Sequence, residues 1–300
     1  MAARSTTTRL AGSACRRAQQ PLCMRRPFSA ATTSPASARK TTPQPRETTS
    51  LSLPPPRWTS ELPARIGKCL AFGCNAQQVS QAAAVLRVIA AEWRDLLAGA
   101  EGFLTGGRRG LEAREIAWGE MDTYAHVNNV NYYRFAESAR MNWITNFAVH
   151  VDPAHHKQWR ELMAPISTGL IMRSLKADFK FPMVYPDRIS VYHKLRTRPE
   201  GEPAPSSFYL DCVVLSHRHR RVACRLEEDI VVYDYKKAGK MSMPGFMLER
   251  FQETWELQEQ AMLQARSRIF GLYTAVDRLE SETWNRPDAV EDMGGPKGSQ

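Results

Sequence analysis

The sequence predicts an α+β fold in which an antiparallel sheet wraps around a long central helix, with additional helices at the N- and C-terminal ends. Three observations carry this prediction. A helical pattern of apolar residues covers residues 130–150. Four segments of strand type follow it, separated by turn residues. Apolar residues spaced three and four apart then recur over a long C-terminal segment. This order favours packing of one sheet face on the helix, and it leaves the other face for solvent or a partner.

The predicted central helix is apolar on nearly every side, which is typical of a buried helix. One stripe consists of Val130, Tyr133, Glu137, Met141, Ile144 and Ala148. The second face carries Phe135, Ala139, Trp143 and Phe147. Before the helix, Ile116 and Trp118 indicate a strand.

Alternation of apolar and polar residues predicts the four later strands. They cover Leu175–Phe181, Ile189–Arg196, Phe208–Ser216 and Val222–Tyr235. Residues 151–167 form an irregular connection in this interpretation. Together with the preceding strand and helix, the four strands define a domain over residues 111–236.

Helices are predicted on both sides of this domain. An N-terminal helical extension covers residues 65–110, with an amphipathic helix at 76–98. A C-terminal amphipathic helix covers 244–284, and its long apolar stripe contains one polar residue, Gln258. We expect this helix to pack on its own domain or on a partner subunit, because a solvated helix would expose too much apolar surface.

The two ends of the chain are of a different type. Residues 1–46 contain nine basic residues and no acidic one. A start rich in Arg, Ser and Thr predicts a mitochondrial transit peptide over 1–28 and a location in the matrix, with a basic tail as the alternative. Residues 29–64, rich in Ser, Thr and Pro, are interpreted as a disordered linker, and residues 285–300 as a disordered tail. Subtracting nine from the formal charge of +10 leaves +1, which argues against nucleic-acid binding by the body of the chain.

The sequence suggests neither a cofactor nor a metal. The chain has six cysteines, without the spacing of a zinc site or a disulfide framework. His150, His155 and His156 have no acidic or cysteine partner at ligand spacing. No apolar stretch approaches the ~18 residues of a membrane-spanning helix, so no transmembrane segment is predicted.

A short polar hinge joins the first strand to the central helix and carries the strongest functional signal. It contains Asp122, His126, Asn128 and Asn129, within the sequence Asp-Thr-Tyr-Ala-His-Val-Asn-Asn-Val-Asn-Tyr that ends at Tyr132. This motif resembles the hotdog-fold thioesterases, in particular the branch of 4-hydroxybenzoyl-CoA and acyl-CoA thioesterases. The resemblance covers about residues 111–236. It implies the hotdog fold, a homodimer or homotetramer with its pocket between protomers, and substrate contacts from Tyr132 and Glu137.

The residues themselves suit thioester hydrolysis, which needs a nucleophile or base and a donor for the developing oxyanion. Asp122 can act as nucleophile or as general base. The N–H of Asn129 is the candidate oxyanion donor, since the first N–H groups of a helix have no intrahelical partner. His126 can orient Asp122, bind the carbonyl or relay a proton.

Each of these residues also has an alternative interpretation, in which its role is structural. Asp122 could cap a turn, and Asn128 or Asn129 could cap the helix. His126 could be a structural histidine. Glu137 could pair with Arg140 or across a dimer. The cluster Arg218, Arg220 and Arg221 could contact CoA phosphates or form a solvated turn.

We therefore predict a thioester hydrolase that acts on acyl-CoA or acyl-ACP without a cofactor. The alternative is a hotdog module without catalysis, serving as a binding or structural subunit of a mitochondrial assembly. A hydratase of the same fold is less favoured, because no second motif supports it.

Overall fold

The sheet contains six antiparallel strands in the order β1-β3-β4-β5-β2, with β6 paired to the end of β5. The strands are β1 (Gly110–Glu115), β2 (Thr168–Phe179), β3 (Arg188–Leu195), β4 (Ser207–Ser216), β5 (Arg221–Asp234) and β6 (Gly239–Lys240). The computed structural model describes residues 52–290. The expected transit peptide, the linker up to residue 51 and residues 291–300 of the expected tail lie outside the described residues.

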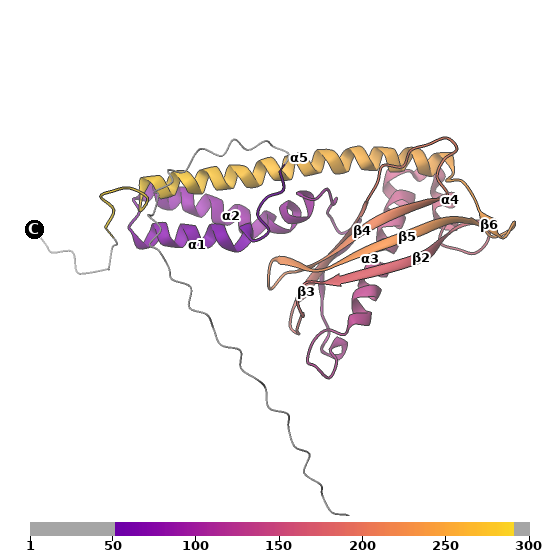
Figure 1. The fold of residues 1–300 in the computed structure, drawn as a ribbon, viewed down its shortest axis with the longest axis horizontal. Coiled ribbons are helices and arrows are strands. Elements are labelled where there is room, and N and C mark those ends of the chain that lie inside the picture. Colours follow the sequence, from indigo (N-terminus) through magenta and orange to yellow (C-terminus); the bar gives the residue numbers. More distant parts are fainter. Residues whose placement is uncertain (1–51, 291–300) are drawn as a thin grey trace, which may run out of the picture. The chain divides into compact units, whose positions relative to one another are not determined.

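The central helix α3 (Asn129–Asn146) connects the two edge strands of the sheet and lies against one sheet face (Figure 1). Its buried side chains include Tyr132, Phe135, Ala139 and Trp143, so the second predicted face is confirmed. The first predicted stripe is wrong in part. Its members Val130, Glu137 and Met141 are exposed, because the sheet covers only one side of the helix.

A bulge in the edge strand β2 keeps its apolar side chains on the helix side. The register with β5 shifts between Met172 and Ser174. Alternation therefore changes phase at Arg173. Leu170 and Met172 before the shift, and Leu175 after it, all pack on the core beside α3.

Two local predictions around α3 need correction. The strand expected to include Trp118 ends at Glu115, and Trp118–Glu120 form a 3₁₀ turn in which Trp118 is exposed. The last residues of the expected helix form a π-helical turn at Phe147–Val151, and the connection expected to be irregular over 151–167 contains a 3₁₀ turn at Pro153–His155 and the short helix α4 (His156–Glu161). Trp159 of α4 is fully buried and stacks on Phe147, which explains the order of this segment.

The N-terminal extension begins earlier than the sequence analysis placed it. The helix α1 (Trp58–Ala71) lies partly inside the expected linker over 29–64. Its apolar positions Trp58, Leu62, Ile66 and Cys69 repeat every three to four residues and are buried. The neighbouring prolines concealed this period, although Pro63 is accommodated inside the helix. The helix α2 (Ala76–Gly99) confirms the second predicted helix.

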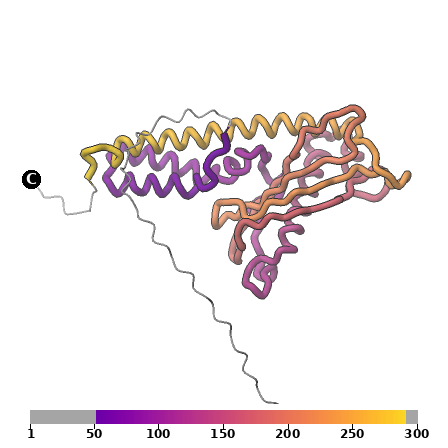
Figure 2. Tube along the Cα trace, in the orientation of Figure 1, coloured from indigo at the N-terminus to yellow at the C-terminus, as the bar shows by residue number. Residues whose placement is uncertain are grey.

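The long C-terminal helix is α5 (Gly245–Glu282), and it packs on its own chain, as one of the two predicted options. It runs past the sheet and continues beside α1 and α2 (Figures 1 and 2). Tyr192, Val213 and Leu215, on the sheet face away from α3, pack against this helical group. The expectation that this face is left to solvent or a partner is therefore wrong for this part of the sheet.

The single polar residue of the C-terminal stripe has a structural function. Gln258 is buried, its Oε1 accepts a hydrogen bond from the Leu195 N–H at 2.9 Å, and its Nε2 donates to the Leu195 carbonyl at 3.1 Å. The amide thus pairs both backbone groups at the end of β3, where an apolar residue would leave them unsatisfied.

Candidate active site

Hydrogen bonds of backbone and asparagine side-chain groups fix the hinge between β1 and α3. The Asn128 Oδ1 accepts from the Val130 N–H at 3.0 Å, so Asn128 caps the helix. The Glu120 carbonyl accepts from the Asn128 N–H at 2.9 Å and from the Asn131 side chain at 2.8 Å. The Val127 N–H donates to the Met183 carbonyl at 2.9 Å. The first turn of α3 is therefore held in place before any ligand binds.

The Glu120 side chain anchors the same hinge from the other side. Its two oxygens accept hydrogen bonds from Arg114 at 2.5 and 3.0 Å, and its Oε2 also accepts one from the Ala117 N–H at 2.8 Å. Burial opposes ionisation of Glu120, but the Arg114 guanidinium and the Ala117 N–H outweigh it and hold the pKa of this carboxyl below its usual range.

A cleft of about 460 Å³ opens beside this hinge. We call it the hinge cleft. Asp122, His126, Asn129 and Tyr132 line one side, and residues 179–182, at the end of β2 and directly after it, line the other. The structure thus brings four of the five predicted site residues together. The sequence analysis did not predict the part of the cleft wall that comes from the end of β2, because the alternation of Phe179 and Phe181 with polar residues indicated core positions.

Asp122 is half-buried at the edge of the cleft. Its Oδ1 accepts a hydrogen bond from the Tyr124 N–H at 2.9 Å, and its own N–H donates to the His126 carbonyl at 2.8 Å. The turn function considered from the sequence is thus present. The carboxylate also lines the cleft, and a carboxylate has lone pairs beyond the one used in the turn.

His126 and Asn129 are exposed in the cleft. Because Asn128 provides the cap, Asn129 is the first residue of α3, and its N–H has no hydrogen-bond acceptor within residues 52–290. A free N–H at the positive end of an 18-residue helix is suited to bind a developing oxyanion.

Tyr132 forms the apolar floor of the cleft. It is 2% exposed, and its ring meets the Phe179 ring edge-on at 5.1 Å. Burial raises the pKa of Tyr132 to about 12, against a backbone hydrogen bond with Met183 that acts in the opposite direction. Tyr132 is thus a neutral side chain at neutral pH and serves as a wall, not as a base.

Glu137 is the predicted site residue that the structure does not bring to the cleft. It lies eight residues after Asn129, about two turns along α3, and is exposed. The suggested pair with Arg140 is also wrong: the Arg140 Nη1 donates to Glu228 of β5 at 2.7 Å. The exposed position removes the cost that a buried, unpaired carboxylate would carry.

Arg140, Glu228 and His193 form a buried charged cluster between α3 and the sheet. The Glu228 side chain is 0% exposed, and His193 Nε2 lies 3.2 Å from its Oε1. Burial opposes the charge of Glu228, but His193 and Arg140 prevail and lower its pKa. Sequence spacing gave no sign of this cluster, since its members come from three separate elements.

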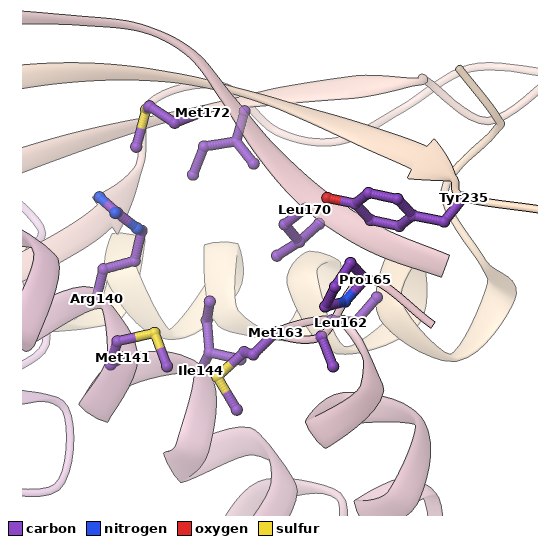
Figure 3. A pocket seen from close by; sticks show the side chains of 11 residues that line it. Arg140, Met141, Ile144, Leu162, Met163, Pro165, Leu170, Met172 and Tyr235 are labelled. Atoms are coloured by element: carbon purple, nitrogen blue, oxygen red, sulfur yellow. The ribbon is translucent and has the colours of Figure 1, made fainter. Parts of the chain in front are cut away.

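The cluster borders a second, largely apolar cavity of about 300 Å³, which we call the methionine pocket (Figure 3). Arg140 and Tyr235 lie at its two ends, and Met141, Met163, Leu170 and Met172 lie between them. Gly169 lies beneath Tyr235, and a Cβ added there would lie 2.6 Å from the ring, so any larger residue would displace the ring.

The described residues contain no cluster of three or more side chains suited to hold a metal ion. His155, however, has the acidic partner that the sequence analysis missed, Asp152, at 3.0 Å. No helix within residues 52–290 is long and apolar enough to cross a membrane. The four cysteines of this range are free, and burial raises the pKa of Cys224 to about 12.

Comparisons with known proteins identify the protein family of this domain. Residues 116–251 match the family model of the thioesterase-like superfamily. This portion of the chain, which contains the hinge and every strand of the sheet except β1, is thus a thioesterase-like domain with the hotdog fold, as the resemblance implied. A comparison with curated protein sequences finds no match.

Solved thioesterases are similar to this chain over about half of its length. A thioesterase of Thermus thermophilus, complexed with coenzyme A and Zn, is 17% identical over 51% of this chain and 98% of its own, with a TM-score of 0.38. A 1,4-dihydroxy-2-naphthoyl-CoA thioesterase of Synechocystis is 14% identical over 48% of this chain and 93% of its own, also with a TM-score of 0.38.

Proposed function

We propose that this protein hydrolyses an acyl thioester, carried by coenzyme A or by ACP, in the hinge cleft. The observation that carries this proposal is the presence, in one open cleft, of Asp122 and of Asn129, whose N–H has no acceptor within residues 52–290. These two groups match the requirements of the reaction, a base or nucleophile and an oxyanion donor.

In the proposed reaction Asp122 activates a water molecule by taking its proton. The water oxygen bonds to the thioester carbon, and the Asn129 N–H stabilises the oxygen that becomes negative. The carbon–sulfur bond then breaks, and the thiolate leaves and takes up a proton. His126, exposed at the same cleft, is placed to hydrogen-bond the carbonyl oxygen. In the alternative scheme the Asp122 carboxylate attacks the thioester carbon directly and the thiolate leaves. Water then hydrolyses the resulting acyl-enzyme anhydride.

We further propose a homodimer formed through the edge of β2. This strand pairs with β5 on one side only, within the described residues. Antiparallel pairing of two β2 strands about their midpoint would place Phe179 of one protomer beside Thr168 of the other. The hinge cleft of one protomer would then approach the methionine pocket of its partner, which offers apolar space for an acyl chain.

A thioester panel tests the function. We expect the full-length protein to release thiol from acyl-CoA or acyl-ACP, measured with a thiol reagent across chain lengths. Sedimentation of the same preparation should show a dimer or tetramer. Release of thiol no faster than in buffer, for every thioester, would refute the proposal.

The second candidate is a binding module without catalysis. The observation that favours it is the engagement of Asp122 in a turn with the Tyr124 N–H, together with the helical group α1, α2 and α5, which offers a docking surface. The same panel separates the two, since a large assembly without thiol release supports the module.

We also propose that the protein acts in the mitochondrial matrix. The proposal rests on the basic, acid-free residues 1–46 and on Arg26-Pro27-Phe28-Ser29, which resembles a processing site. Isolation of the mature protein from mitochondria should give an N-terminus at Ser29. An intact N-terminus in a cytosolic fraction would contradict this proposal.

A further inference from the structure

A third cavity lies where the N-terminal extension meets the thioesterase-like domain. It has a volume of about 270 Å³, and we call it the proline pocket. Its walls come from residues 53–58, from the end of α2, and from the start of β5. We propose that this pocket binds the phosphorylated adenosine end of a coenzyme A thioester. The inference rests on the proposed function, because it places the thioester end of the same molecule in the hinge cleft.

The charges of the pocket suit phosphate. Four cationic side chains line it, Arg57, Lys180, Arg221 and Arg225, against the single carboxylate of Glu101. Glu101 is already bound by Arg225, through two bonds of 2.6 Å. Arg57 and Arg221 are exposed and form no ion pair with any residue of the described range. Free guanidinium groups are the side chains best suited to bind phosphate in a bidentate way.

The rest of the pocket lining suits the flat adenine ring of coenzyme A. Pro54, Pro55 and Pro56 form an apolar wall with Leu97 and Val222. The Arg221 guanidinium lies over the Phe181 ring at 3.9 Å, which holds it at the pocket. The pocket also includes Trp58, the first residue of the 14-residue helix α1, whose indole adds to the apolar wall.

The proline pocket and the hinge cleft share one residue, Lys180, and are therefore neighbours. A CoA thioester bound with its phosphates at Arg221 and Arg57 would extend past Lys180 toward Asp122. A thioester on ACP keeps the phosphate of its pantetheine arm but lacks the adenosine and its 3′-phosphate, so it cannot fill this pocket. The structure thus points to coenzyme A as the carrier.

Binding of adenosine 3′,5′-bisphosphate, the isolated nucleotide end of CoA, tests the inference without any turnover. We expect calorimetric titration of the full-length protein to show binding that weakens by about tenfold or more in Arg221→Gln and in Arg57→Gln. The ratio of kcat/KM for acyl-CoA to that for acyl-pantetheine should fall by the same factor. Arg218→Gln is the matched control. Arg218 lies in the turn directly before β5, is exposed and does not line the pocket, so the nucleotide affinity of this variant should stay within about twofold of the wild type.

The outcomes separate this inference from the proposed function. Equal nucleotide affinity in the wild type, Arg221→Gln and Arg57→Gln would overturn the inference, even with full hydrolase activity. Absence of nucleotide binding to the wild type, or a preference for acyl-ACP that Arg221→Gln leaves unchanged, would overturn it as well. Nucleotide binding that depends on Arg221, in a protein that hydrolyses no thioester, would support the pocket and refute the hydrolase. Thermal unfolding of each variant shows that it is folded.

Discussion

Asp122→Asn is expected to reduce kcat for thioester hydrolysis by about a thousandfold, the loss typical for removal of a general base. The substitution removes the negative charge and the basicity of the side chain. The asparagine oxygen can still accept the Tyr124 N–H bond, so the turn should remain. The KM should change far less than kcat, because Asp122 is one of several residues in the cleft.

The control for the Asp122→Asn variant is a measurement of its thermal unfolding. Asp122→Asn should unfold at the wild-type temperature, whereas Asp122→Ala should also lose the turn and unfold earlier. Stopped-flow or continuous thiol assays at saturating substrate give kcat. A variant that keeps its rate to within about threefold, well below the factor expected for a base, would exclude Asp122 as base or nucleophile.

Glu228→Gln is expected to lower the free energy of unfolding by about 3 kcal/mol at pH 7, the lower end for breaking a buried ion pair. It would leave the Arg140 guanidinium facing a neutral amide between α3 and the sheet, and it would weaken the contact with His193. Urea unfolding measures the difference. Glu227→Gln, an exposed neighbour on the same strand, is the control and should cost at most about 0.5 kcal/mol.

The pH dependence gives this prediction a second readout. The pKa of Glu228 in the folded protein lies below the ordinary value of 4.5, because His193 and Arg140 outweigh the effect of burial. A lowered pKa contributes stability that is present above about pH 4.5 and is lost as the pH falls through the folded-state value. The difference between wild type and Glu228→Gln should therefore shrink in acid. A difference that stays constant down to about pH 3 would show that the carboxylate charge is not the cause.

Local patterns in the sequence determined most of the elements. The period of Phe135, Ala139 and Trp143 located the buried face of α3, and alternation located β3, β4 and β5 within one or two residues. The long stripe around Phe251 and Ile269 located α5. The hinge motif also led to the correct class of protein, because Asp122, His126 and Asn129 are close in sequence and must lie close in space.

Tertiary structure decided what depends on contacts between distant segments. The sequence did not indicate that β2 pairs with β5, nor that Arg140 reaches Glu228 rather than Glu137. The sequence also did not reveal α1. Pro63 and the prolines before the helix indicated a linker, and the spacing of the buried apolar residues of α1 becomes clear only from their packing against α5. Each of the three cavities joins segments of the chain far apart in sequence, and their residues show no common spacing. Periodicity records which side of an element is buried, whereas the partner on that side is set by the packing of the whole chain.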